Sequence, residues 1–62
     1  MSVLEEFIEE IKAQGINKVA SEANVTGGTL RNWLSGRNIP VLTTAELVAD
    51  AMGYKLILVP KE

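Results

Sequence analysis

Residues 17–36 read NKVASEANVTGGTLRNWLSG. Apolar residues recur there every three or four positions, in two runs separated by a turn, which is typical of two short helices. The first run carries a narrow apolar stripe of small residues, Val19, Ala20 and Ala23, and we expect Asn17 to cap its beginning. Small residues allow close packing, so this stripe predicts a helix that lies against its neighbours.

The second run predicts a helix that begins after Thr26 as N-cap and ends at Gly36. Its apolar side consists of Leu30, Trp33 and Leu34. The Gly-Gly pair within residues 25–30 also permits a β-hairpin. Because the helical spacing continues beyond that pair, we favour the helix.

The rest of the chain predicts two more helices and one strand. Residues 3–11 have helical spacing, with Ser2 and Glu5 placed as a capping box and Gly15 as the stop. A later helix is expected to start at Thr43, capped with Glu46, and to end at Gly53. Its expected apolar face comprises Leu47, Val48, Ala51 and Met52. Residues 54–59, YKLILV, read as a strand that ends before Pro60.

A single strand leaves its backbone N–H and C=O groups unpaired, and an isolated strand is unstable. We therefore expect this strand to pair antiparallel with its counterpart in a second copy of the chain. The residues expected at this dimer contact are Tyr54, Leu56, Ile57, Leu58 and Val59. The predicted fold is mainly α: one domain, residues 1–62, with a bundle of about four helices and a C-terminal β-strand.

Composition excludes most catalytic chemistry. The 62 residues include no His and no Cys, so the commonest general base and the usual soft metal ligands are missing. We expect no enzyme, no metal site and no cofactor. The start of the sequence lacks the basic residues of a signal peptide, and no apolar run is long enough for a membrane span. The expected location is the cytoplasm, without a membrane partner.

Charge is distributed unevenly along the chain, whose net charge is −2. Residues 1–10 contain four Glu and no base, for −4, which is typical of a solvated helix face. Residues 11–45 contain four bases and only Glu22, for +3, and residues 46–62 contain three acids and two Lys, for −1. The basic middle region is therefore the part of the chain suited to an anionic partner.

Residues 16–36 resemble the helix-turn-helix of the Cro and lambda-repressor-like (XRE-like) family, with the two helices and turn at 17–35. In that family's pattern the buried positions correspond to Val19, Ala20, Ala23, Val25, Leu30 and Trp33. Asn24 replaces the usual turn glycine and tolerates the same left-handed backbone. The resemblance continues after this segment: the second helix ends with residues 33–36, and a Pro-containing loop and a fourth amphipathic helix follow, as in the family.

The resemblance implies that residues 26–35 form a recognition helix in the DNA major groove. The implied base-reading positions are Asn32, Arg31 and Thr29, with the backbone at Gly28 and Gly27 where relatives commonly present side chains. The implied phosphate contacts are Lys18, Thr26, Ser35, Arg37 and Asn38.

The function that we expect is regulation of transcription, as a repressor of prokaryotic or phage type. A homodimer would bind a palindromic operator in double-stranded DNA. One alternative is an antitoxin-type regulator that also binds a toxin. Another is a protein-interaction module that adds its C-terminal strand to a partner's sheet.

Overall fold

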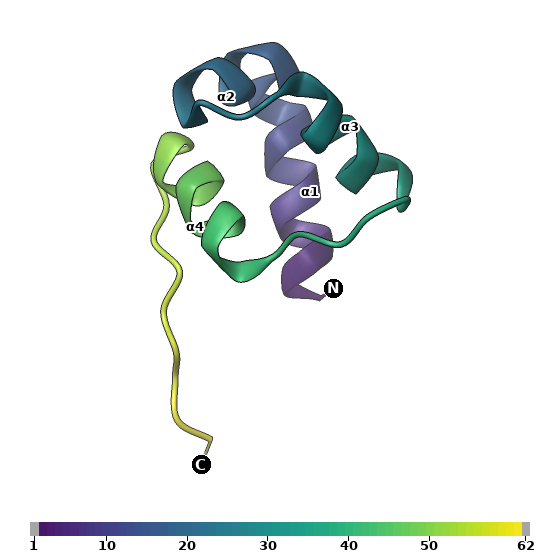
Figure 1. Ribbon diagram of the computed structural model, residues 1–62. Helices are drawn as coiled ribbons and strands as arrows, with labels where there is room; N and C mark the ends of the chain where they lie inside the picture. Colours follow the sequence, from purple (N-terminus) through teal and green to yellow (C-terminus); the bar gives the residue numbers. More distant parts are fainter. Residues whose placement is uncertain (1, 62) are drawn as a thin grey trace.

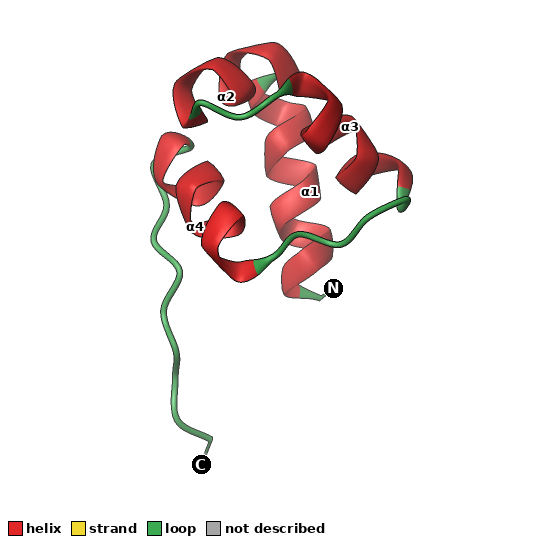
Figure 2. Cartoon of the chain, viewed as in Figure 1, coloured by secondary structure: helices red, strands yellow, loops and turns green. Residues whose placement is uncertain are grey.

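The computed structural model describes residues 2–61, which form four helices and a C-terminal segment without regular structure (Figures 1 and 2). The helices are α1 (Val3–Gln14), α2 (Ile16–Ala23), α3 (Gly27–Ser35) and α4 (Leu42–Ala51). In this range α2 contacts the other three helices. The expectation of a small, mainly helical bundle is confirmed, and the region read as a possible hairpin begins α3 instead.

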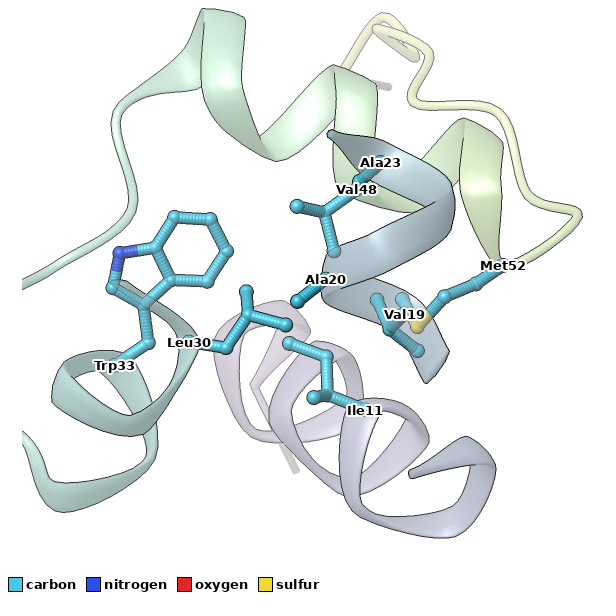
Figure 3. Packing of buried hydrophobic residues seen from close by; sticks show 8 residues of the cluster. All are labelled: Ile11, Val19, Ala20, Ala23, Leu30, Trp33, Val48 and Met52. Atoms are coloured by element: carbon cyan, nitrogen blue, oxygen red, sulfur yellow. The ribbon is translucent and has the colours of Figure 1, made fainter. Parts of the chain in front are cut away.

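The core collects side chains from all four helices (Figure 3). Its buried members are Ile11, Val19, Ala20, Ala23, Leu30, Trp33, Val48 and Met52. Trp33 is only 4% exposed, and its ring centroid lies 5.9 Å from that of Phe7. The predicted inward orientation of Trp33 is thus confirmed, whereas Val25 is half-buried and packs against the edge of the core.

The first helix begins as the sequence predicts. The backbone N–H of Glu5 donates to Ser2 Oγ at 3.1 Å, and the Ser2 N–H donates to Glu5 Oε1 at 2.9 Å. These two hydrogen bonds form the capping box. Hydrogen bonding to the Glu5 carboxyl, from the Ser2 backbone first and from the Ser2 side chain second, lowers its pKa. α1 ends at Gly15, whose φ of 101° is a conformation that side chains rarely adopt.

The predicted cap of the second helix is wrong. α2 begins at Ile16, so Asn17 lies inside the helix and its side chain caps nothing. Gly15 alone separates α1 from α2, and its carbonyl accepts the N–H of Val19 at 3.0 Å. The backbone of this one-residue connection therefore sets the start of α2.

The fourth helix also differs from its prediction. It begins at Leu42 with Val41 as N-cap, and no side chain accepts a cap hydrogen bond, so Thr43 and Glu46 form no capping box. Leu47, predicted on the apolar face, is 58% exposed. Val48 and Met52 are buried as predicted, and Ala51 is half-buried against the core. Ala45 and Ala49, which were not predicted, are buried as well.

The strand predicted at residues 54–59 does not form within the described chain, since residues 2–61 contain no other strand to pair with it. The Tyr54 N–H donates to the Ala49 carbonyl at 2.8 Å, and the chain then extends away from α4 (Figure 1). Leu58 is 100% exposed, and Ile57 and Val59 are exposed at 70% and 75%. Three large apolar side chains thus project beyond the bundle.

Candidate nucleic-acid interface

α2 and α3 are joined by a short turn whose geometry is set by Asn24. Asn24 has φ 59° and ψ 42°, the left-handed conformation expected for it, and its N–H donates to the Ser21 carbonyl at 3.3 Å. The next N–H, of Val25, donates to the Ala20 carbonyl at 3.0 Å. These bonds satisfy the end of α2 while the chain reverses direction, so α3 starts after two more residues.

Thr26 caps α3 as predicted. Its Oγ1 accepts the backbone N–H of Thr29 at 3.2 Å and lies 2.9 Å from Thr29 Oγ1, a second hydrogen bond. The Thr29 hydroxyl is therefore engaged within the chain, and its side chain is half-buried. Thr29 is consequently less available as a base-reading side chain than residues on the outer face of α3.

The outer face of α3 lies opposite the buried Leu30 and Trp33. The helical positions on this face are Gly28, Arg31, Asn32 and Ser35. Arg31 is exposed and Asn32 is half-buried, and neither side chain makes a hydrogen bond or ion pair with residues 2–61. Two side chains with the chemistry for reading guanine and adenine are thus adjacent and unengaged.

The guanidinium of Arg31 folds back toward the first turn of α3. A Cβ atom built on Gly27 would lie 3.2 Å from Arg31 Nη1 and 3.5 Å from Nη2, so the glycine leaves room for this approach. At Gly28 the nearest atom to such a Cβ is Thr26 Oγ1 at 3.9 Å, which is open space by comparison. The two glycines therefore differ: an added Cβ would approach the Arg31 guanidinium at residue 27 and not at residue 28.

The end of α3 is organised by the backbone carbonyl of Asn32, a role that the sequence analysis missed. This oxygen accepts the N–H of Arg37 at 2.9 Å and that of Asn38 at 3.3 Å, as well as Ser35 Oγ–H at 3.2 Å. Gly36, with φ 80°, allows the chain to turn back and make these bonds. The glycine after α3 was the available signal, because such caps collect following N–H groups onto one carbonyl.

The expected phosphate contacts fall into three places. Thr26 lies at the beginning of α3, and Ser35, Arg37 and Asn38 lie at or after its end; all four are exposed. Lys18 is exposed on α2, a different element. Within residues 2–61 the single ion pair joins Lys12 to Glu9 at 3.7 Å, so Lys18, Arg31 and Arg37 keep their charges uncompensated by direct pairing.

Charge separates along the fold. Residues 16–38, which contain α2, α3 and the following turn, hold Lys18, Arg31 and Arg37 against Glu22, for a net +2. α1 holds four Glu and Lys12, for −3. The helix pair is therefore the cationic part of the molecule.

An apolar surface in the loop between α3 and α4 was not predicted from the sequence. Ile39 and Val41 are exposed, as is Leu42 at the start of α4. Apolar residues in a loop indicate an exposed apolar surface, but this loop was interpreted only from its Pro and Asn content. Ile39 and Leu42 line a groove that α1 and α4 form between them.

None of the helices in residues 2–61 has both the length and the apolar character that a membrane crossing requires. In the same range no three His, Cys, Asp or Glu side chains gather as metal ligands would. Comparisons with protein families, with curated proteins and with solved structures found no match.

Proposed function

We propose that this chain is a cytoplasmic, sequence-specific regulator that binds double-stranded DNA as a homodimer, with α3 in the major groove. The observation that carries the proposal is the outer face of α3. Leu30 and Trp33 fix the helix to the core, while Arg31 and Asn32 stand on the other side without partners in the described chain. A rigid helix with unengaged Arg and Asn side chains is suited to reading base edges.

The ends of α3 supply the positioning contacts. The Asn32 carbonyl holds the backbone of Arg37 and Asn38 against the end of α3, so these two residues and the base-reading residues belong to one structural unit. Contacts to phosphates fix the register of such a unit on the duplex without reading sequence. A dimer would use two of these units on half-sites about 34 Å apart, and occupancy of such a palindromic operator would repress transcription by excluding other proteins.

The test is selection of bound duplexes from a random DNA library at about 150 mM salt, where non-specific binding by a few charges is weak. We expect a palindromic motif to be enriched. Three cations per subunit, Lys18, Arg31 and Arg37, would neutralise about six phosphates, giving a slope near −5 for log affinity against log salt concentration. No enrichment with folded protein, or a slope near zero, would overturn the proposal.

The exposed apolar tail and loop favour one second candidate, a protein-interaction module. Such a module would bind a protein through the tail and leave α3 unused. The same selection separates the two functions, since this candidate predicts no enriched duplex. Capture of one defined protein by the wild-type chain, lost when Leu58 and Val59 are replaced by Ser, would then support it.

A further inference from the structure

An open, mostly apolar groove lies between α1 and α4, apart from the outer face of α3. Its volume is about 540 Å³, within the range of roughly 300–1,000 Å³ that is typical of small-ligand sites. Val3 and Phe7 of α1 line one wall, and Ala45 and Ala49 of α4 line the other. Because α2 packs against both helices, the core holds the two walls in place.

A positioned carboxylate lies in this groove. Glu10 is half-buried, and Gln14 Nε2 donates to its Oε2 atom at 2.8 Å. The same amide donates to the Met52 carbonyl at 3.1 Å, so Gln14 ties the carboxylate to the end of α4. Glu6, one turn earlier on α1, also lines the groove, and neither carboxylate forms an ion pair within residues 2–61. The groove therefore offers a negative charge that has no direct cationic partner in the described chain.

Two aromatic rings lie near the Glu10 carboxylate. Phe7 is three residues before Glu10 on the same helix face, and both line the groove. The negative charge of Glu10 raises the pKa of the Tyr54 phenol, so the second ring also lies near this carboxylate. The buried Trp33 packs against Phe7, with ring centroids 5.9 Å apart, which restrains the orientation of Phe7. Aromatic faces and carboxylates both attract organic cations.

We propose that the α1–α4 groove binds a lipophilic organic cation, with its apolar body between the helices and its positive charge beside Glu10, Phe7 and Tyr54. This site goes beyond the proposed DNA function, because no residue of α3 lines the groove.

Charge complementarity selects the class of ligand. Glu6, Glu10 and one cation, Lys55, line the groove. Lys55 is exposed on the tail, whereas Glu10 is half-buried between the walls, so the charge inside the groove is negative. An anion of similar size would bring a second negative charge next to Glu10, and this repulsion would weaken its binding.

The apolar lining favours a cation whose charge is spread over an apolar body. Removing a compact, strongly hydrated ion from water costs more free energy than one carboxylate returns. A lipophilic cation is weakly hydrated and also buries apolar surface against Val3, Ala45 and Ala49, so both of its parts gain from the groove.

Two ions of nearly equal size and shape but opposite charge test this selectivity: tetraphenylphosphonium and tetraphenylborate. Calorimetric titration of the full chain should show saturable binding of tetraphenylphosphonium, one ion per chain, and about tenfold weaker binding of tetraphenylborate. Equal affinities, or no saturable binding of the cation, would overturn the proposal. An affinity that falls as the protein concentration rises would show that a second copy fills the groove, and would overturn it as well.

Glu10→Gln and Glu9→Gln are a matched pair, since each removes one negative charge from α1. Glu10→Gln keeps an oxygen that can accept from Gln14, and Glu9 does not line the groove. Glu10→Gln should raise the dissociation constant of tetraphenylphosphonium about fivefold, and Glu9→Gln should change it less than twofold. Circular dichroism should show the same helix content in both variants. Equal effects on affinity would mean that only the overall charge matters, which would contradict a site at Glu10.

Tyr54 variants test the aromatic contact. Tyr54→Phe keeps the ring and should bind tetraphenylphosphonium as the wild type does, whereas Tyr54→Leu keeps only apolar area and should bind about threefold more weakly. A leucine variant with wild-type affinity would refute the placement of the charge beside this ring.

Amide chemical shifts locate the site. Tetraphenylphosphonium should shift the NMR signals of Phe7, Glu10 and Met52 and leave those of Arg31 and Asn32 unchanged. Shifts confined to α3 would overturn groove binding. Because these titrations contain no DNA, the groove site and the DNA function can each fail while the other stands.

Discussion

The guanidinium of Arg31 lies next to the space that a side chain at residue 27 would fill. A Cβ atom built on Gly27 would be 3.2 Å from Arg31 Nη1. Long side chains on a helix point back toward its N-terminus, so residues i and i+4 meet in this way. Because Gly27 has no side chain, the Arg31 guanidinium can lie at the first turn of α3, where the helix also presents free N–H groups. Both features suit an approaching anion.

Gly27→Ala and Gly28→Ala form a matched pair that tests this relationship. Each should raise the free energy of unfolding by up to about 1 kcal/mol, because Ala loses less backbone entropy in a helix than Gly. Only Gly27→Ala should displace the Arg31 guanidinium and weaken DNA binding through it. Urea unfolding and DNA titration of each variant in the Arg31 and Arg31→Ala backgrounds check this. An effect of Gly27→Ala on affinity that persists without Arg31 would contradict the explanation.

Asn32→Ala and Arg37→Ala should affect DNA binding differently. Asn32→Ala removes the side chain and keeps the carbonyl that accepts from Arg37 and Asn38, so the end of α3 should stay in place. It should cost about 1–3 kcal/mol on the preferred site and relax the preference at one base pair per half-site.

Arg37→Ala should instead weaken all sequences alike and make the salt slope shallower, since a phosphate contact carries no sequence information. Titration of the selected site and of single-base variants of it distinguishes the two substitutions. The reverse pattern would exchange the roles of Asn32 and Arg37.

Thr26→Ala should destabilise the chain by about 1 kcal/mol, because the N–H of Thr29 loses the hydroxyl oxygen that it donates to. Thr26→Ser keeps that oxygen and should lose less than half as much. Urea unfolding of the three proteins measures the difference. A serine variant as unstable as the alanine variant would show that the threonine methyl, and not the cap, supplies the stability.

The capping box of α1 makes stability depend on pH in a defined direction. Hydrogen bonds from the backbone and side chain of Ser2 lower the pKa of Glu5 in the folded state. Its contribution is therefore complete above the ordinary carboxyl pKa and is lost as pH falls through the lowered value. The difference in unfolding free energy between the wild type and Glu5→Ala should shrink from pH 7 to pH 3. A difference that grows on acidification would contradict this sign.

The sequence predicted the parts of the candidate interface that depend on neighbours along the chain. The Thr26 cap, the left-handed Asn24 and the stop at Gly36 each use hydrogen bonds that span at most six residues. The outer face of α3 followed from the same periodicity, since Leu30 and Trp33 identify the inner face. The contact of Arg31 with Gly27 did not follow, because it depends on which way a long exposed side chain folds.

What the sequence by itself determined is the set of helices, most of their ends and the apolar stripes of α2 and α3, because these follow from local hydrogen bonds and from spacing. The tertiary structure alone determines how α4 is rotated. Its rotation puts the small Ala45 and Ala49 on the inside together with Val48 and leaves Leu47 exposed, although Leu is more apolar than Ala. The groove beside α1 and the unpaired tail arise in the same way, since both depend on where separate elements meet and where they do not.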